Sequence, residues 1–285
     1  MRAVTAPDAM SPIAVFDSGV GGLAVLHECL VSLPHEDFVY LADTARFPYG
    51  DRDPGELREF ALELGELLLA EGAKLLVVAC NSATSAALPA LREALAGRAE
   101  VVGVVEPESR RAARVSANGR IGLLATPATV ASGAYERTLE RVAAGAVLTS
   151  VPCPELAPYI QRGEEVDGRL VELVDGYCAP LLSAGVDTVI LGCTHYPLVR
   201  PILQRALGRG VEIVTSGQAI ADAVQEALEA GALARPASGP RGDYRFLCSG
   251  DPAEFGRLGK RFLQLPIGDV RRIEVAPARA LGRAA

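Results

Sequence analysis

Residues 75–82 read LLVVACNS, and residues 188–195 read TVILGCTH. Each segment is an apolar run that ends at a cysteine and is followed by small polar residues and then by a helical pattern. Continuous apolar runs of this kind are typical of parallel strands covered on both faces. Cys80 and Cys193 are 113 residues apart (193 − 80), about the length of one α/β domain. The echo therefore predicts two α/β units, each with a cysteine at the carboxyl end of a strand, where ligand sites form in parallel sheets.

Short apolar runs alternate with longer helical patterns along almost the whole chain. Residues 55–71, for example, form a helical pattern between two of the apolar runs. This alternation predicts an α/β fold with mostly parallel sheets flanked by helices. The Pro-, Gly- and Ser-rich residues 234–242 are typical of a linker, and we expect residues 276–285 to be frayed. The predicted strands are Ile13–Asp17, Phe38–Ala42, Leu75–Cys80, Val101–Val105, Ile121–Thr126, Ala146–Val151, Thr188–Cys193, Glu212–Thr215 and Tyr244–Cys248.

Composition narrows the class of protein. The 285 residues are 49% hydrophobic and 22% charged, with a net charge of −7, which favours a globular protein of two domains and disfavours nucleic acid as a partner. No apolar run approaches 18 residues, and the N-terminus lacks the apolar segment of a signal peptide, so we expect no membrane span and a cytoplasmic location. In that reducing compartment six cysteines do not indicate a disulfide framework.

The segment Cys80-Asn81-Ser82-Ala83-Thr84 combines a thiol with amide and hydroxyl groups at the start of a helix. The helix dipole is expected to lower the pKa of Cys80, and the polar side chains and free backbone amides could hold a carboxylate. The alternative for such a cysteine is a small buried hydrophobic residue. A polar sequence directly behind the thiol favours the reactive interpretation.

The segment Gly192-Cys193-Thr194-His195 places a histidine two residues after a thiol, where it could orient or activate Cys193. A zinc site is the alternative, but it requires further ligands, and no C-x-x-C or H-E-x-x-H motif is present. Cys29, Cys178 and Cys248 are expected in the core. The role of Cys153 is left open, and His27 and His35 are expected at the surface or at helix caps.

Two polar loops follow the first two predicted strands. Asp17-Ser18-Gly19-Val20-Gly21-Gly22 fits part of a dinucleotide-binding pattern, but a carboxylate at its start opposes pyrophosphate binding. A glycine turn capped by Asp17, or a functional Asp17 beside a small ligand, are the alternatives. Residues 42–50 (ADTARFPYG) could offer backbone amides and the Tyr49 hydroxyl to a ligand, or could form an ordinary surface turn.

Taken together, these residues resemble the glutamate racemases of the aspartate/glutamate racemase superfamily. The resemblance extends from residue 13 to about residue 220 and rests on five ordered segments: IAVFDSGVGGL (13–23), LADTARFPYG (41–50), VVACNSAT (77–84), IGLLATPATV (121–130) and VILGCTHYPL (189–198). It implies two pseudo-symmetric α/β domains, formed by residues 12–105 with 215–275 and by residues 106–214, with the active site in the cleft between them.

The resemblance also assigns roles to residues of this chain. It implies that Cys80 and Cys193 are the catalytic thiols and that Asp17 and His195 are their polar partners. It further implies a homodimer, glutamate as the small-molecule substrate, and supply of D-glutamate for peptidoglycan and so for the cell wall and cell shape. No motif for a metal, pyridoxal phosphate or flavin is evident in the sequence, so we expect no cofactor. The substrate-binding residues that it implies are Asp17, Ser18, Tyr49, Gly50, Asn81, Ser82, Thr126, Thr194 and His195.

Two positions depart from the family pattern. Ser82 stands where the family usually has Thr, which preserves a hydroxyl. Gln161 stands where a segment similar to residues 153–160 is usually followed by Glu. Either Glu155, Glu164 or Glu165 supplies the missing carboxylate, or His195 works without one.

Racemisation requires one group that removes the α-proton and a second group that returns a proton to the opposite face, because a single base tends to return the proton to its original face. Two thiols can exchange these roles between directions. An aspartate racemase or another carbon-acid enzyme of the superfamily is one alternative function. A non-catalytic amino-acid-binding module is the alternative from a different class.

Overall fold

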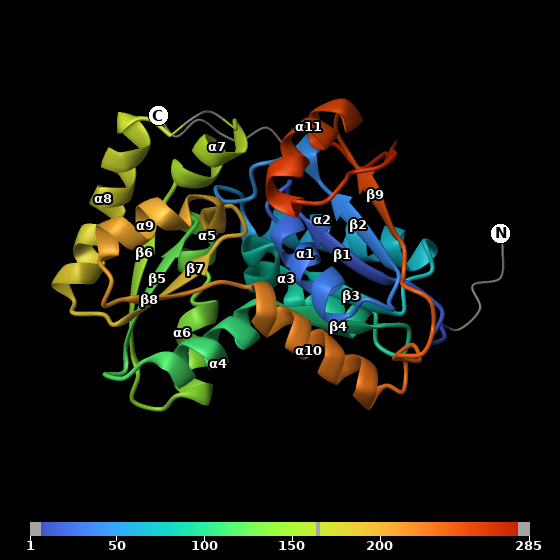
Figure 1. Ribbon diagram of the computed structural model, residues 1–285, viewed down its shortest axis with the longest axis horizontal. Helices are drawn as coiled ribbons and strands as arrows, with labels where there is room; N and C mark the ends of the chain where they lie inside the picture. The colour runs from blue at the N-terminus through green and yellow to red at the C-terminus, as the bar shows by residue number, and fades with distance from the viewer. Residues whose placement is uncertain (1–6, 164–165, 279–285) are drawn as a thin grey trace.

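The structure is a computed structural model that describes residues 7–163 and 166–278. Two sheets lie side by side, each flanked by helices (Figure 1). Strands are parallel in every pair of both sheets within these residues, which confirms the α/β class expected from the apolar runs. We call the six-stranded sheet and its helices the first lobe, and the four-stranded sheet and its helices the second lobe.

The sheet of the first lobe has the order β10-β9-β2-β1-β3-β4. Its strands are β1 (Ile13–Asp17), β2 (Phe38–Ala42), β3 (Leu75–Val78), β4 (Glu100–Gly103), β9 (Tyr244–Cys248) and β10 (Val270–Arg272). The sheet of the second lobe has the order β6-β5-β7-β8. Its strands are β5 (Arg120–Ala125), β6 (Val147–Pro152), β7 (Thr188–Gly192) and β8 (Glu212–Val214).

The central strand β1 shows why apolar runs predict this fold. All five of its residues are buried, and they alternate between two hydrophobic clusters. Ile13 and Val15 belong to a core that continues into the second lobe, whereas Ala14 and Phe16 belong to a core on the other face of the sheet. Because both faces of such a strand are covered, its sequence is a continuous apolar run and does not alternate between apolar and polar residues.

Helices cover both faces of each sheet. In the first lobe, α2 and α3 pack together on one face and α1 packs against α10 and α11 on the other. The helices are α1 (Leu23–Ser32), α2 (Pro54–Ala70), α3 (Asn81–Ala94), α4 (Val105–Val115), α5 (Pro127–Ala131), α6 (Ala134–Val142), α7 (Leu156–Gln161), α8 (Gly168–Ser183), α9 (Arg200–Leu207), α10 (Gly217–Ala230) and α11 (Pro252–Leu263), with short 3₁₀ turns at Thr44–Arg46 and Tyr196–Val199. None of the helices in the described ranges is both long and apolar enough to cross a bilayer.

Local sequence signals set some of the element boundaries. The helix expected at residues 55–71 is α2, which begins at Pro54 because Asp53 caps it by accepting a hydrogen bond from the Gly55 amide at 2.7 Å. The nine predicted strands are all present, most with ends displaced by one or two residues. The strand β10 was not predicted, because Val270–Arg272 is a short and largely exposed edge strand with no apolar run.

The chain passes between the lobes twice, from β4 into α4 and from β8 into α10. The strands of the first sheet therefore come from residues 13–103 and 244–272, and those of the second sheet come from residues 120–214. The domain boundaries at 105/106 and 214/215 stay predictions. Glu108, just after the first crossing, accepts a hydrogen bond from Ser216, at the second crossing.

Candidate active site

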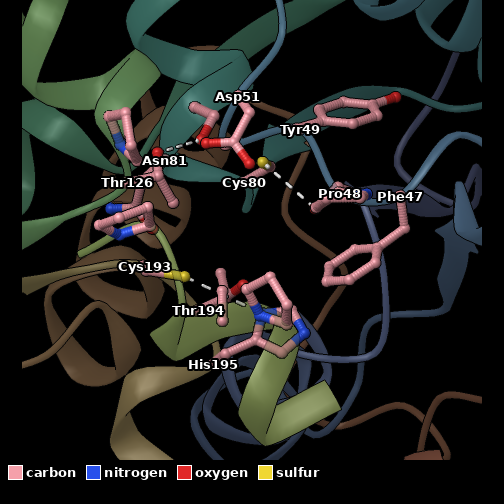
Figure 2. Close-up of a pocket in the computed structure, with 17 residues that line it drawn as sticks. Phe47, Pro48, Tyr49, Asp51, Cys80, Asn81, Thr126, Cys193, Thr194 and His195 are labelled. Carbon is pink, nitrogen blue, oxygen red and sulfur yellow. Dashed lines mark hydrogen bonds between the residues drawn. The ribbon is translucent and has the colours of Figure 1, made fainter. Parts of the chain in front are cut away.

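A pocket lies where the carboxyl ends of strands from both lobes meet (Figure 2). Loops that follow β1, β2 and β3 of the first lobe and β5, β6 and β7 of the second lobe supply its wall. This is the location expected for a ligand site in parallel sheets. The lining residues are Ser18, Phe47, Pro48, Tyr49, Gly50, Asp51, Cys80, Asn81, Ser82, Thr126, Pro127, Pro154, Ala157, Pro158, Cys193, Thr194 and His195.

Cys80 and Cys193 lie on facing walls of this pocket (Figure 2). Cys80 is the N-cap residue of α3 in the first lobe, and Cys193 directly follows β7 in the second lobe. Their exposed fractions are 4% and 7%, so both side chains are accessible chiefly from the pocket. The structure thus brings together two thiols that are 113 residues apart (193 − 80) in the sequence.

The expectation that the helix dipole lowers the pKa of Cys80 is wrong. Burial, with a further contribution from the charge of Asp17, raises the pKa of Cys80 to about 12, although the Ala83 amide and Ser18 act in the opposite direction. Burial also holds the pKa of Cys193 well above its ordinary value, and the charge of Cys80 adds to the effect. Desolvation exceeds the helix-end effect here because both lobes close over the thiols. The protein alone therefore keeps both groups as neutral thiols near pH 7.

Asp17 lies behind the wall of the pocket and is absent from its lining. Its Oδ2 accepts hydrogen bonds from the amides of Gly19 at 3.0 Å and Gly22 at 3.1 Å, and its Oδ1 accepts one from the Thr194 hydroxyl at 3.2 Å. Burial raises the pKa of this carboxyl, against the effect of those donors. Asp17 thus orders the glycine turn of the first lobe and fixes Thr194 of the second.

His195 is enclosed by side chains of both lobes. Its Nδ1 lies 3.9 Å from Cys193 Sγ, and its Nε2 lies 2.6 Å from Gln161 Oε1. The rings of Phe47 and Phe262 are 5.4 and 5.6 Å from the imidazole, centre to centre. Burial lowers the pKa of His195 to about 4, so the imidazole is neutral at physiological pH. Because the Gln161 oxygen is an acceptor, this network assigns the hydrogen to Nε2 and leaves the lone pair of Nδ1 toward Cys193.

Gln161 itself therefore occupies the position beside His195 at which the sequence resemblance led us to expect a carboxylate. Glu155 is not a substitute, because it is exposed and pairs with Arg169 at 2.9 Å. Glu164 and Glu165 lie outside the described residues. Within the part of the chain that the structure describes, His195 works with an amide as its partner.

Asn81 lines the pocket next to Cys80, but its donors are already in use. The amide Nδ2 donates to Tyr135 Oη at 2.7 Å and to the carboxylate of Glu108 at 3.2 and 3.3 Å. The sequence predicts Asn81 as a donor to a substrate carboxylate, and this arrangement does not offer that role. Glu108, a fully buried carboxylate in the middle of a charged helix, was not predicted as part of the site.

Three hydroxyl groups from two lobes meet at one side of the pocket. The Ser82 hydroxyl lies 2.9 Å from that of Thr126 and 3.2 Å from that of Thr129, and Thr126 donates to Thr129 at 3.0 Å. Ser82 and Thr126 line the pocket, as expected for substrate-binding residues. Thr84 points elsewhere, because its hydroxyl donates to the Val78 carbonyl at 2.9 Å.

The loop after β2 is part of the site and is more than a surface turn. Tyr49 and Gly50 line the pocket, but the Tyr49 hydroxyl donates to buried Asp43, which also accepts from Arg46 at 2.6 Å and from Ser249 at 2.7 Å. Tyr49 therefore presents its ring to the pocket and not a free hydroxyl. The Gly50 carbonyl accepts from the Ala128 amide at 2.8 Å, which joins this loop to the second lobe.

The four other cysteines do not line this pocket. Cys29, Cys178 and Cys248 are buried, as expected for core residues. Cys153 is also fully buried, and its thiol donates to the Val151 carbonyl at 3.5 Å. The predicted site did not include Asp51, Ala157 or the prolines at 127, 154 and 158, which also line the pocket, because none of them carries a recognisable chemical pattern.

Comparisons with known proteins agree on one family. Residues 23–224 match the family described as Asp/Glu/Hydantoin racemase. The glutamate racemase of Acidothermus cellulolyticus is 43% identical over 259 residues, which cover 91% of this chain and 97% of that protein. The crystal structure of the glutamate racemase isoform RacE1 of Bacillus anthracis superposes with a TM-score of 0.87 at 35% identity, covering 94% of this chain and 99% of that one. A structure of the Francisella tularensis glutamate racemase in complex with D-glutamate gives a TM-score of 0.86 at 26% identity, covering 93% and 98%.

Proposed function

Because the chain belongs to the Asp/Glu/hydantoin racemase family and is an amino-acid racemase, we propose that it interconverts L- and D-glutamate, with two thiols as acid and base. The glutamate racemases that match over nearly their whole length support this substrate. The observation that carries the proposal is the placement of Cys80 and Cys193 on facing walls of one pocket.

The two thiols divide the chemistry between the two faces of the substrate. The thiolate of one cysteine removes the proton from Cα, and that proton ends on its sulfur. The other cysteine then gives its S–H proton to the opposite face of Cα and becomes the thiolate. The reverse reaction exchanges the roles, so proton number and charge balance in both directions.

The raised pKa of both thiols requires a source of activation, and the substrate supplies one. The α-ammonium group of glutamate brings a positive charge into a buried pocket, and an opposite charge close to a thiol favours the thiolate. The Nδ1 lone pair of His195, 3.9 Å from Cys193 Sγ, is placed to accept the proton that Cys193 loses. The Cys80 thiol donates to Ser18 Oγ at 3.7 Å, and its hydrogen bonds with the Ala83 amide and with Ser18 lower its pKa and so favour the thiolate.

The negative charge of the substrate requires donors in a pocket whose lining, among the described residues, contains no lysine or arginine. The Ser82 hydroxyl and the backbone amides at the start of α3 are the available groups, because the Thr194 hydroxyl donates to Asp17 and the Thr126 hydroxyl donates to Thr129. Neutral donors fixed in a water-poor site stabilise the charge that develops when Cα loses its proton.

The direct test is to incubate L-glutamate with the purified protein and no added cofactor while following circular dichroism. We expect the signal of L-glutamate to decay to zero as the racemic mixture forms, and D-glutamate to approach the same end point from the opposite sign. A steady signal from folded protein would refute the proposal.

The same assay with L-aspartate separates the alternative within the superfamily, which would turn over aspartate faster. A non-catalytic binding module is separated by the racemisation assay itself, because it would bind glutamate without changing the circular dichroism signal of L-glutamate. The resemblance further supports a cytoplasmic homodimer that supplies D-glutamate for peptidoglycan. We include these roles in the proposal.

Gln161→Glu is expected to make activity more sensitive to acid. A carboxylate 2.6 Å from His195 Nε2 raises the pKa of the imidazole, which burial holds at about 4 beside glutamine. Below the raised pKa the imidazole is protonated on both nitrogens, and Nδ1 can no longer accept the Cys193 proton. We expect kcat/KM at pH 6, relative to pH 8, to fall by about tenfold compared with the unmodified protein. Gln161→Leu, which adds no charge, serves as the control, and an equal change in both variants would contradict this role for the amide.

Gly21→Ala is expected to disturb the contact between the lobes at the site. A Cβ atom at this position would lie 2.5 Å from Thr194 Oγ1 and 2.6 Å from His195 Nδ1, so the loops around Cys193 must move away. A displacement of about 1 Å can cost about 10²-fold in rate, and we expect a loss of that order in kcat. Gly210→Ala is the matched control, because a Cβ there meets no atom within 4 Å. Equal kcat values for the two variants would contradict the prediction.

A further inference from the structure

The carboxylate of Glu108 is a buried charged group near the pocket that the proposed mechanism does not use. Its side chain is fully buried, and it lies on α4, just beyond the first crossing between the lobes. Burial raises its pKa to about 7, against the effect of donors from Ser216, Tyr135 and Asn81. Among the described residues no lysine or arginine forms an ion pair with it. A buried carboxylate held by neutral donors alone requires an explanation other than charge pairing.

The partners of Glu108 come from three other helices and both lobes. Ser216 at the start of α10 donates to Oε1, and Tyr135 of α6 donates to Oε2. Asn81 Nδ2 of α3 lies 3.3 and 3.2 Å from the two carboxylate oxygens and donates to the Tyr135 hydroxyl at 2.7 Å. At pH 8, above its pKa of about 7, the Glu108 carboxylate is ionised and only accepts hydrogen bonds, so the amide of Asn81 turns its NH₂ group toward it.

This orientation determines which end of the Asn81 amide is left for a ligand. Both hydrogens of Nδ2 are committed to Glu108 and Tyr135, whereas Oδ1 is buried and accepts no hydrogen bond from the described residues. Asn81 lines the pocket beside Cys80 (Figure 2). A buried carbonyl oxygen without a donor is costly, and a ligand that donates a hydrogen bond removes that cost.

We propose that Glu108 is a positioning residue that holds the Asn81 amide with its carbonyl oxygen available to the substrate, where that oxygen accepts a hydrogen bond from the α-ammonium group. The inference rests on the proposed function, since an amino-acid substrate supplies the ammonium group. Of the groups that a glutamate molecule offers at physiological pH, the ammonium is the only hydrogen-bond donor. Glu108 thereby distinguishes amino acids from dicarboxylates that lack an amine.

Glu108→Gln tests the inference, because it keeps the shape of the side chain but supplies its own NH₂ group. Glutamine can donate to Asn81 Oδ1 as readily as it can accept from Nδ2, so the amide of Asn81 is free to reverse. Binding is measured by calorimetry at pH 8 for D-glutamate and for glutarate, which has both carboxylates and no amine. We expect the preference for glutamate over glutarate to fall by about tenfold or more in Glu108→Gln, with KM raised more than kcat is lowered.

Two further variants make the result specific. Glu106→Gln is the matched control on the same helix, because Glu106 is at the surface and pairs with Arg110 and Arg141, and its preference should equal that of the unmodified protein. Asp51→Asn tests whether the carboxylate that lines the pocket, and not Asn81, is the ammonium partner. An unchanged preference in folded Glu108→Gln, or a loss of preference confined to Asp51→Asn, overturns the inference.

A crystal structure of the unmodified protein with D-glutamate gives an answer that does not depend on how a variant folds. We expect the ligand nitrogen within about 3.2 Å of Asn81 Oδ1. A ligand carboxylate oxygen at that position overturns the inference. Racemisation by the unmodified protein is measured separately, so a failure of the proposed function is distinguishable from a failure of the role given to Glu108.

Discussion

Cys80→Ser and Cys193→Ser are each expected to lower kcat for glutamate racemisation by about 10²- to 10⁴-fold, in both directions. A hydroxyl has nearly the same size as a thiol but a much higher pKa, so it cannot form the base that removes the α-proton. Each substitution should still leave one functional thiol on the opposite wall. In D₂O we therefore expect each variant to exchange the α-hydrogen of one enantiomer, without inversion, and the two variants to act on opposite enantiomers. Proton NMR of each pure enantiomer measures this exchange.

Cys248→Ser is the control for these two variants. Cys248 is fully buried at the end of β9, and its thiol already donates to the Gly250 carbonyl at 3.6 Å, so a hydroxyl is accommodated there. Because Cys248 is not part of the pocket, kcat should be unchanged. Full activity of either Cys80→Ser or Cys193→Ser in both directions would show that the facing thiols do not form the acid–base pair.

The burial that raises the pKa of both thiols also has a use. A thiol that ionises only when a cation enters the pocket is protected from reaction in the absence of substrate, because the thiolate is the reactive species. The same closure places Gly21 of the first lobe against Thr194 and His195 of the second, so the two halves of the site have little room to drift. Protection of the thiols and alignment of the site thus have one cause, the close contact of the two lobes.

The parts of the fold that were predicted from sequence are those that local patterns determine. The strands Ile13–Asp17, Phe38–Ala42 and Tyr244–Cys248 have the predicted bounds, because each is an apolar run stopped by a polar or turn-forming segment. β10 was missed because Val270–Arg272 gains its hydrogen bonds from β9 and has little apolar character of its own. Whether such a short segment forms a strand depends on the neighbouring strand with which it pairs, and its own sequence does not contain that information.

The same distinction holds for the site. The positions of Cys80 and Cys193 followed from strand ends and from the family resemblance, but the direction of their pKa shifts did not, because burial depends on the opposite lobe. Glu106 and Glu108 are two residues apart in one charged helix, and only the second is buried. Its partner Ser216 is 108 residues farther along the chain. No pattern within the helix distinguishes the two glutamates.

Lys74→Met is expected to cause the largest loss of stability among single substitutions away from the pocket. The side chain of Lys74 is fully buried, and its ammonium group donates to Glu36 Oε2 at 2.6 Å and to the carbonyls of Ala9 at 2.7 Å and Leu233 at 2.8 Å. Burial lowers the pKa of Lys74, against the effect of Glu36. Removing the cation leaves the Glu36 carboxylate, 5% exposed, without its counter-charge. We expect the free energy of unfolding to fall by about 3–5 kcal/mol.

Urea unfolding, followed by far-UV circular dichroism and by tyrosine fluorescence, measures this loss. Arg98→Met is the control, because its ion pair with Glu66 is about half exposed on each side and should contribute only about 0–1 kcal/mol. The double variant Lys74→Met with Glu36→Leu removes both charges, and we expect it to recover much of the stability that Lys74→Met loses. The recovery should stay incomplete, since Glu36 also accepts the Arg235 amide at 2.8 Å and two carbonyls lose their donor. A double variant no more stable than Lys74→Met would assign the loss to those backbone contacts and not to the uncompensated carboxylate.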